Sequence, residues 1–491
     1  MKHVNKFKSY LALVIATLIV GSSCSKKTDD TPIAGNPKIL SFGFYAEDNE
    51  DNLFRDYVVE NVTGTAITIA LPKDADKSKL VARFTTSDDV TVTVGGANQV
   101  SGSTALNFAA PVDYIVTERE TNARYTVTVA NAADYVWSRL GAYTEYAVGS
   151  YEMRINQNNA APYFLFRLAV TETENQKAYV AKYENNSWST IGKDISDGRI
   201  GTFLDLAFND DGTLYITYPD YNQTPESAPT VKKYNGTTWS NVGTGNPIPA
   251  SVSYGALSFN PSTNQPVLFN YINDRNYTIA RRAAVSTFFD GTAWNTANSK
   301  IADRDYTSTA GIMKAKRVND VVYLAIQNHA TAKGYSVYTY QQNTWTTIAN
   351  EVLEEGSTLT NTYDFDLDVS SEGDIYIMVS DNATGAQLTR VKKYNATTKT
   401  WSQIGDPFTL SRHFAFALAP NGTPYVIYRN DQEFPVVVSF DHDTQNWGNE
   451  TVLENSQVEN VFIDFSNDGT GYASFGLDNN IILHKFDVPA N

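Results

Sequence analysis

Seven tryptophans recur at nearly regular intervals, and they constrain the fold of this chain more than any other feature. They are separated by 51, 51, 55, 51, 56 and 46 residues, and the amino-acid sequences that follow them are similar, as in Trp188-Ser-Thr-Ile-Gly192 and Trp239-Ser-Asn-Val-Gly243. The full set is Trp137, Trp188, Trp239, Trp294, Trp345, Trp401 and Trp447. A period of about 50 residues is typical of propellers and solenoids. The chain is therefore predicted to contain an array of like units.

One repeat shows what the unit is. Residues 203–208 and 213–218 alternate large apolar residues with small or polar ones around an Asn-Asp-Asp-Gly turn, which predicts two strands joined by a hairpin. Residues 230–234, an Asn-Gly turn and the segment opened by Trp239 add two more strands. A sheet of four short antiparallel strands cannot bury both of its faces alone, so such units are expected to stack on one another.

The two ends of the array predict how it closes. The last repeat stops after its third strand, near residues 481–486, whereas residues 135–141 form an outer strand with no repeat in front of it. We expect these two segments to pair, because ring closure removes the exposed edges of an open array. Seven tryptophan strands then predict a seven-bladed β-propeller over residues 132–491.

Two motifs resemble known propeller repeats. The pairing of an aromatic residue with a tryptophan across a short turn resembles the kelch-type repeat, and Gly-Thr-Thr-Trp239 and Gly-Thr-Ala-Trp294 resemble part of the sialidase Asp box. The kelch diglycine and the complete Asp box are absent. The tryptophans are expected to pack between blades.

The first residues carry an export signal. Lys2, Lys6 and Lys8 precede an apolar run over residues 10–20 that is too short to span a bilayer, so residues 1–23 are predicted to be a secretory signal peptide. The following Gly-Ser-Ser-Cys24 resembles a bacterial lipobox, and Cys24 is the only cysteine. This resemblance implies that Cys24 is acylated and that Ser25 directs the protein to the outer membrane. The alternative is an ordinary signal with an incidental cysteine.

Residues 24–37 are polar and are expected to form a flexible tether, after which residues 38–131 change character. Alternating segments such as 66–71 and 124–129 predict about seven short, half-buried strands. Tyr114-Ile-Val116 and Tyr125-Thr-Val-Thr-Val129 resemble the small β-sandwich of Bacteroidetes surface lipoproteins. The predicted fold class is therefore all-β, with an Ig-like β-sandwich before the propeller. We expect the sandwich to be a spacer, and a second binding module is the alternative.

Charge and motifs exclude several classes of function. The formal net charge is -16, and removal of the signal peptide leaves about -19, so nucleic acid and anionic membrane surfaces are poor partners. The four histidines beyond the signal peptide lie in different repeats without metal-ligand spacing. No nucleophile elbow, phosphate loop or dinucleotide fingerprint is present. The sequence thus indicates no reaction and no organic cofactor.

Aspartates on predicted inner strands are candidate metal ligands. Asp364, Asp366 and Asp368 alternate along one strand and so share a face. By their offset from the turn glycine, Asp205 matches Asp366, and Asp464 matches Asp368. A channel ringed by carboxylates could hold Ca²⁺, and the alternative is hydrated acids lining a wet channel. The candidate metal ligands are Asp205, Asp366, Asp368 and Asp464.

Variable connections on one rim of the propeller are the candidate ligand site. They follow the second and fourth strands of each repeat and are rich in Tyr, Asp, Asn and Arg, which suit a glycan because rings stack on sugars while polar groups meet hydroxyls. The predicted function is a non-catalytic, lipid-anchored surface protein that binds an extracellular glycan or a protein partner. The candidate residues are Asp220, Tyr221, Tyr271, Asp274, Arg275, Asn328, His329, Asp381, Arg412, Arg429 and Asp431.

Two other functions remain open from the sequence. One is a glycoside hydrolase or lyase that uses rim carboxylates such as Asp220, Asp274 or Asp431. The other is a scaffold subunit of an outer-membrane complex.

Overall fold

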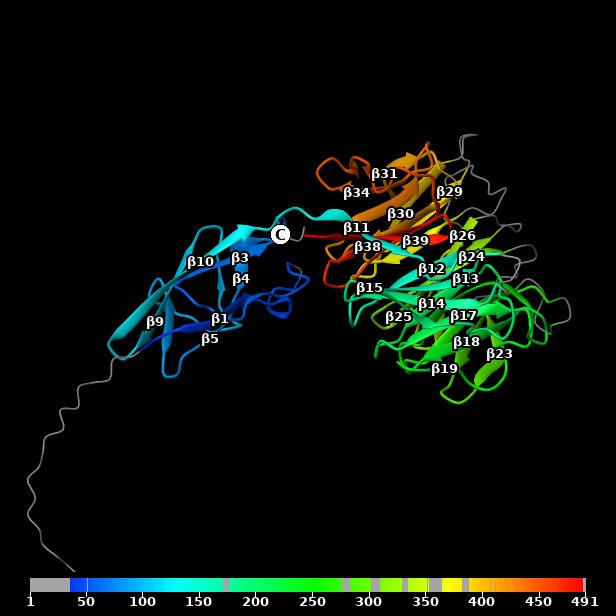
Figure 1. Ribbon diagram of the computed structural model, residues 1–491, viewed down its shortest axis with the longest axis horizontal. Coiled ribbons are helices and arrows are strands. Elements are labelled where there is room, and N and C mark those ends of the chain that lie inside the picture. The colour runs from blue at the N-terminus through cyan, green and yellow to red at the C-terminus, as the bar shows by residue number, and fades with distance from the viewer. Residues whose placement is uncertain are drawn as a thin grey trace, which may run out of the picture.

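The computed structural model describes residues 36–488, apart from 51, 171–175, 275–276, 278–282, 302–309, 329–333, 351, 353–363, 382–387 and 411. Figure 1 shows two parts, a small one that begins near the N-terminus and a larger one made of many strands. In the described residues the regular structure is strand, apart from two 3-10 turns, η1 (Ala46–Asp48) and η2 (Lys77–Lys79). The protein is all-β, as predicted.

The N-terminal part is a β-sandwich. One sheet has the strand order β2-β1-β5 and the other β3-β10-β9-β6-β7, with β10 parallel to β3. Phe42, Phe44, Phe108 and Tyr114 fill the core between the sheets, and their rings meet edge to face. The strands are β1 (Ile39–Phe44), β2 (Tyr57–Val59), β3 (Ala66–Leu71), β4 (Leu80–Val81), β5 (Arg83–Thr86), β6 (Thr91–Val94), β7 (Ala97–Asn98), β8 (Ala105–Leu106), β9 (Val112–Glu118) and β10 (Thr121–Asn131).

The larger part is a ring of seven antiparallel sheets, each with four main strands, and in blades 1 to 6 these strands follow in chain order from the centre outward. Blades 1 to 3 are β12 (Val148–Asn156), β13 (Ala161–Leu168), β14 (Ala178–Glu184) and β15 (Ser187–Gly192); β16 (Asp205–Phe208), β17 (Leu214–Asp220), β18 (Ala228–Tyr234) and β19 (Trp239–Asn241); and β20 (Val252–Phe259), β21 (Pro266–Ile272), β22 (Ala284–Phe289) and β23 (Trp294–Lys300).

The other blades repeat this plan. Blades 4 and 5 are β24 (Ala310–Val318), β25 (Val321–Asn328), β26 (Gly334–Gln341) and β27 (Thr344–Ala349); and β28 (Asp366–Val369), β29 (Ile375–Asp381), β30 (Leu388–Asn395) and β31 (Thr400–Phe408). Blade 6 is β32 (Phe414–Leu418), β33 (Pro424–Arg429), β34 (Pro435–Asp441) and β35 (Asn446–Trp447), with β36 (Thr451–Val452) also paired to β34. Blade 7 is β37 (Glu459–Phe465), β38 (Gly471–Leu477), β39 (Asn480–Asp487) and, from the other end of the chain, β11 (Val136–Tyr143).

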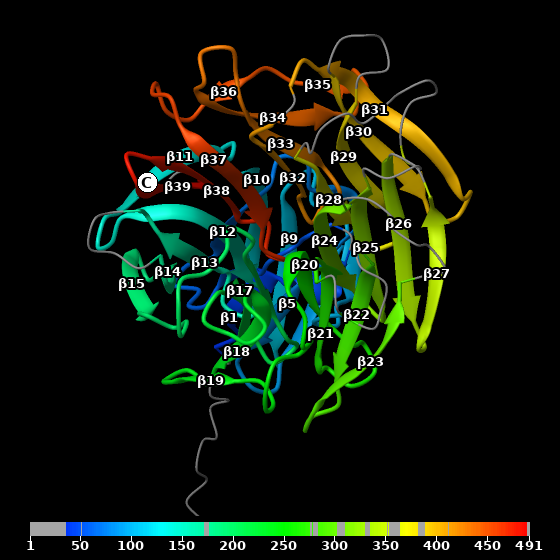
Figure 2. The same cartoon turned by 90° about the vertical axis from the view of Figure 1, so that its right-hand side faces the viewer.

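Strand β11 closes the ring. It pairs antiparallel with β39, and Trp137 lies opposite Phe486. Figure 2 shows the closed ring face-on, with β11 beside β39 and the C-terminus. The predicted seven-bladed propeller, completed by an N-terminal outer strand, is therefore confirmed.

The tryptophans hold neighbouring blades together. The indole Nε1 of Trp239 donates to the carbonyl of Ile191, and that of Trp294 donates to the carbonyl of Val242, at 2.9 and 2.7 Å. Both carbonyls belong to the preceding blade. The ring of Trp239 also packs on Tyr234 of its own blade, with centroids 5.1 Å apart. The repeated aromatic pair thus fills the outer seam between sheets.

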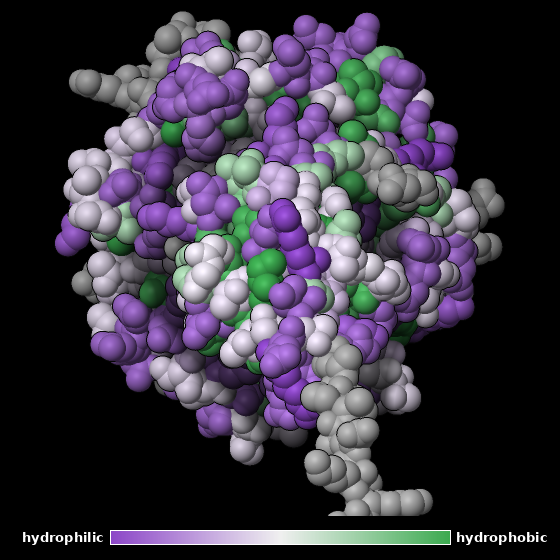
Figure 3. All heavy atoms as spheres, turned by 90° about the vertical axis from the view of Figure 1, so that its left-hand side faces the viewer, coloured by the Kyte–Doolittle hydropathy of each residue, from purple (hydrophilic) through white to green (hydrophobic). Residues whose placement is uncertain are grey.

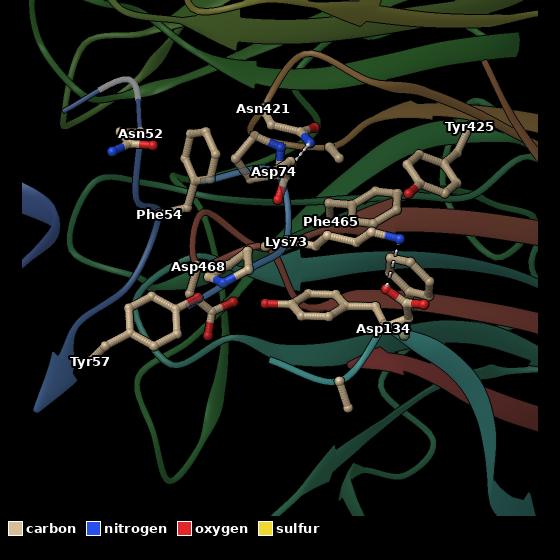
Figure 4. Close-up of a pocket in the computed structure, with 17 residues that line it drawn as sticks. Asn52, Phe54, Tyr57, Lys73, Asp74, Asp134, Asn421, Tyr425, Phe465 and Asp468 are labelled. Carbon is tan, nitrogen blue, oxygen red and sulfur yellow. Dashed lines mark hydrogen bonds and ion pairs between the residues drawn. The ribbon is translucent and has the colours of Figure 1, made fainter. Parts of the chain in front are cut away.

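The sandwich lies against one face of the propeller, the face that carries the short turns between first and second strands. Arg55 pairs with Asp487 at 3.2 Å, and Asn421 in the β32–β33 turn donates to Asp74 at 3.4 Å. Figure 4 shows the cavity of about 430 Å³ between the two parts, which Tyr57 of the sandwich and Phe465 of the propeller both line. The starts of the inner strands and the described connections, such as residues 221–227, therefore lie on the opposite face, at the right of Figure 1.

The surface seen from the sandwich side is largely hydrophilic (Figure 3). The exposed large apolar residues of the described chain include Leu40, Val100 and Val136, which are far apart in the sequence. Single exposed apolar residues are normal on a protein surface in water. The surface on this side is therefore mostly polar, with a smaller group of hydrophobic residues near the centre of the view (Figure 3).

Candidate functional site

The candidate site is a depression of about 260 Å³ at the centre of the face turned away from the sandwich. It is built where the seven inner strands begin, and each blade contributes to its wall. Figure 2 looks onto this face. The lining residues are Ser150, Tyr151, Glu152, Thr202, Phe203, Leu204, Tyr254, Ile312, Lys314, Asp364, Phe365, Asp366, His413, Phe414, Ala415, Asn460, Val461 and Phe462.

Aromatic rings form one part of the wall. Phe203, Tyr254 and Phe462 are half-buried, and Phe462 packs on Tyr151 with ring centroids 4.7 Å apart. A side chain at Gly255 would lie 3.1 Å from the ring of Phe203 and closer still to the backbone of the next strand, so glycine lets β20 approach this ring. Partly exposed rings on a rigid frame can stack on the apolar face of a sugar.

Charged groups form the other part of the wall. Glu152 lies 3.4 Å from Arg154 and 3.7 Å from Lys314. Burial raises the pKa of Glu152, although both cations oppose the rise. Burial disfavours the charge on Lys314, but Glu152 and Asp366 outweigh it and raise the pKa of the amine. Of these groups, Glu152 and Lys314 line the depression, which therefore offers an acceptor and a cationic donor to a polar ligand.

The candidate metal ligands have other partners. In each of Asp205, Asp366, Asp368 and Asp464, Oδ1 accepts the N–H of the following residue. The second oxygen, Oδ2, accepts a backbone N–H from the inner strand of the next blade, at 2.8 to 3.2 Å. The donors are Leu257, Phe416, Leu418 and Ile155, respectively. These aspartates join adjacent blades around the channel.

Cations of the protein itself balance these carboxylates. Arg154 lies 3.4 Å from Asp205, and Lys316 pairs with Asp368. Throughout the part of the chain that the structure describes, no group of three or more His, Cys, Asp or Glu side chains is placed to hold a metal ion. In this structure the four carboxylates are held by ion pairs and backbone hydrogen bonds, and Ca²⁺ binding by them stays an untested prediction.

Two of the predicted rim residues are buried. Asp220 is fully buried, and its carboxylate accepts the N–H groups of Asp197, Gly198 and Asn222 at 3.0, 3.2 and 2.9 Å. Tyr271 is 2% exposed and belongs to the core shared by blades 3 and 4. Both side chains support the rim from below and are not on its surface.

The other predicted rim residues are spread around the ring. Tyr221, Arg412 and Asp431 are exposed, while Asp274 and Arg429 are half-buried. Asn328 and Asp381 end β25 and β29, and their side chains, like residues Arg275, His329 and Cys24, lie outside the described residues. None of the predicted rim residues lines the central depression.

Sequence reasoning missed the charged residues of blade 1. The offset from a turn glycine located the aspartates, but the corresponding turn of blade 1 has Ala160, which adopts a φ of 51° in place of glycine. The positions of Glu152 and Arg154 on the inner strand therefore could not be inferred by counting from a turn glycine. A search for charged residues at the start of every inner strand would have found both.

Comparison with known proteins gives one match in sequence. Residues 54–129 match the family model described as SGBP, N-terminal. They lie in the sandwich. No curated protein matches the chain.

Solved structures show distant likeness. An ulvan lyase bound to a GlcA–Rha3S oligosaccharide is 13% identical over 70% of this chain and 95% of its own, with a TM-score of 0.48. The Aleuria aurantia lectin is 11% identical over 59% and 94%, with a TM-score of 0.38. A DUF4623 family protein from Bacteroides eggerthii is 11% identical over 93% and 99%, with a TM-score of 0.35. All three TM-scores lie below 0.5, so these likenesses carry no weight for function.

Within the described ranges, no helix has the length and apolar character needed to cross a membrane.

Proposed function

We propose that this protein binds an extracellular glycan at the cell surface, on the propeller face turned away from the sandwich. The observation that carries the proposal is the match of residues 54–129 to the SGBP N-terminal family, a family of surface glycan-binding proteins. The match covers the sandwich alone. The role of the propeller is therefore argued from its geometry.

The arrangement of the two parts supports this face as the binding face. The sandwich covers the turns on the other side, where a second hollow of about 860 Å³ includes Phe54 of the sandwich in its wall. Phe203, Tyr254 and Phe462 offer apolar surface on the free face, beside the charged pair Glu152 and Lys314. Such a mixture of rings and polar groups suits a carbohydrate.

The finer part of the proposal concerns the anchor. The lipobox-like Gly-Ser-Ser-Cys24 supports acylation of Cys24, and the polar residues 24–37 support a tether between the outer membrane and the sandwich. In this arrangement residues 38–131 space the propeller, residues 132–491, away from the lipid. Cys24→Ala is expected to abolish labelling by a radioactive fatty acid and to release the protein from the membrane fraction.

A polysaccharide screen tests the binding function. The purified full-length protein in detergent is applied to neutral and acidic polysaccharides in affinity gel electrophoresis, and released sugars are assayed in the same samples. We expect retardation by at least one polysaccharide without release of sugar. Release of sugar would show that the protein cleaves the polysaccharide, and the proposed binding function would then be replaced by an enzymatic one. A lack of retardation by every polysaccharide, with capture of one fixed protein partner from the outer membrane, would contradict the proposal.

A further inference from the structure

Two arginines and a tyrosine from separate segments meet at the junction of blades 1 and 2, on the same free face. Arg167 stands near the end of β13, Arg199 lies in the connection from β15 to β16, and Tyr221 follows β17. The N–H of Tyr221 donates to the carbonyl of Arg199 at 3.1 Å. The guanidinium of Arg199 lies over the ring of Tyr221, 4.2 Å from its centroid. Arg167 lies opposite Ala178 in the β13–β14 pairing, and the N–H of Ile200, next to Arg199, donates to the carbonyl of Gln176 at 3.1 Å. The backbone therefore brings the segments that carry the three residues together.

The connection that carries Arg199 is held rigidly. The buried carboxylate of Asp220 binds the N–H groups of Asp197 and Gly198, directly before the arginine. A Cβ at Gly198 would lie 2.6 Å from Asn222, and one at Gly201 would lie 2.9 Å from Pro219. Only glycine therefore allows this connection to pack so closely on the end of β17. Asp220 is a positioning residue for Arg199.

Neither arginine has an anionic partner in the described chain. The Nε of Arg167 is buried and makes no hydrogen bond with the described residues. The ion pairs of the described residues include neither Arg167 nor Arg199. Burial lowers the pKa of Arg167, Tyr221 opposes this shift, and the charge of Arg199 adds to the lowering. The nearby acid Asp220 is already bonded to backbone donors.

Two neighbouring arginines without an anionic partner destabilise the folded protein, and a bound anion relieves this. A buried donor without a partner is unfavourable, and two like charges held together repel. Guanidinium groups present forked donors that match the two oxygens of a carboxylate or a sulfate, and they stay charged. Because the whole protein is strongly acidic, a polyanion would otherwise be repelled, so a local cationic pair decides whether it binds.

We propose that Arg167 and Arg199 form a subsite for an acidic group, a carboxylate or a sulfate, of an anionic glycan. The inference rests on the proposed function, since it names the class of glycan that the free face takes. The guanidinium groups of Arg199 and Arg167 bind the acidic group, and Tyr221 gives Arg199 a flat support and offers a partly exposed ring beside it.

Matched probes distinguish the two anions. Binding of the full-length protein in detergent is measured to polygalacturonate and to its fully methyl-esterified form, and to dextran sulfate and unmodified dextran. We expect one acidic polymer to bind at least about tenfold more tightly than its neutral counterpart, which is about 1.4 kcal/mol. The polymer that does so identifies the carboxylate or the sulfate.

Three variants locate the effect. Arg199→Gln and Arg167→Met should each weaken binding to that polymer about tenfold or more, and Arg199→Lys should weaken it less. Arg124→Gln removes the same charge from an exposed position on the sandwich and should leave the affinity unchanged. Thermal unfolding of each variant confirms that it folds, and Arg199 is exposed, so its replacement leaves the core intact.

The outcomes separate the two claims. Equal affinity for acidic and neutral polymers would overturn the subsite while leaving glycan binding in place. An equal loss in Arg124→Gln would show non-specific attraction and would overturn it too. Failure to bind any polysaccharide would overturn the proposed function together with the subsite.

Discussion

Asp220 is fully buried beneath the rim of the propeller, where its carboxylate accepts three backbone N–H groups. An acid in a variable, polar loop predicts a ligand contact from the sequence, because loops on a rigid scaffold carry most binding residues. Its actual partner is the connection before Arg199, which packs closely only because of Gly198 and Gly201. The residue therefore shapes the rim, and its influence on a ligand passes through Arg199.

Replacement of Asp220 by Ala is expected to lower the free energy of unfolding by about 2 to 3 kcal/mol, because buried backbone donors lose a charged acceptor. Urea unfolding measures the loss. Asp431→Ala, at an exposed position of the same rim, should change stability by less than about 0.5 kcal/mol. Unchanged stability together with lost glycan binding would show instead that Asp220 meets the ligand directly.

His484 makes stability depend on pH. Its side chain is 4% exposed, and neither ring nitrogen has a hydrogen-bond partner in the described chain. Burial, with a smaller contribution from Arg139, lowers the pKa of the imidazole to about 4. The unfolded chain, with a pKa near 6.5, takes up the proton first as the pH falls. The stability that comes from keeping His484 neutral in the core is therefore fully present above pH 6.5 and is lost as the pH falls from about 6.5 to 4.

Between pH 7 and pH 5 this one group should lower the free energy of unfolding by about 2 kcal/mol. Urea unfolding of the natural protein and of His484→Leu at both pH values checks the expectation, since the variant lacks this part of the pH dependence. Equal losses in the two proteins would rule out His484 as the source.

At the scale of the strand, the inner aspartates act as bridges between blades. Asp205, Asp366 and Asp464 each bond to their own strand and to the next one around the ring, so they link blade 2 to blade 3, blade 5 to blade 6, and blade 7 to blade 1. Asp464 has a special place because its partner, Ile155, belongs to blade 1. It joins the last blade to the first and so supports closure together with β11.

Asp464→Ala is expected to lower the free energy of unfolding by about 1 to 3 kcal/mol, because the buried N–H of Ile155 loses its acceptor. Hydrogen exchange gives a sharper test. The amide of Ile155 should exchange faster, while the amide of Phe416, bonded to Asp366 at the junction of blades 5 and 6, should not change. Equal acceleration at both amides would mean a general loosening and would contradict a local bridge.

Much of the propeller could be predicted from the sequence, because each blade must bury two faces and therefore repeats its pattern. The tryptophan spacing, the hairpin turns and the outer strand around Trp137 all follow from that requirement. The chemistry of the channel could not be predicted in the same way. Glu152 meets Lys314 only because seven strands converge at one axis, and separation along the chain says nothing about which charges meet there.

At the scale of the whole molecule, the sandwich and the propeller touch through few polar contacts around a cavity. Arg55 pairs with Asp487 and lies over the ring of Tyr135, in the linker between the two parts. Most of the remaining contact surrounds the hollow of about 430 Å³ (Figure 4). An interface of this kind permits motion between domains once its polar contacts are removed.

Arg55→Ala should therefore loosen the sandwich from the propeller. Small-angle scattering is expected to show a larger radius of gyration and a broader distance distribution than for the natural protein, while Arg124→Gln, which also removes an arginine from the sandwich, should leave the curve unchanged. A curve for Arg55→Ala that matches the natural protein would contradict a hinge held by this ion pair.

The central claim is that the propeller face away from the sandwich binds a glycan, and affinity measurements on paired variants test it most directly. Isothermal titration of the full-length protein with the polysaccharide selected in the screen is compared with Tyr254→Ala on that face and Asn158→Ala on the opposite one. We predict that Tyr254→Ala raises Kd by about tenfold or more, the effect of losing a ring at the centre of a binding surface, whereas Asn158→Ala leaves Kd unchanged. The reverse pattern, or equal affinity in all three proteins, would contradict the claim.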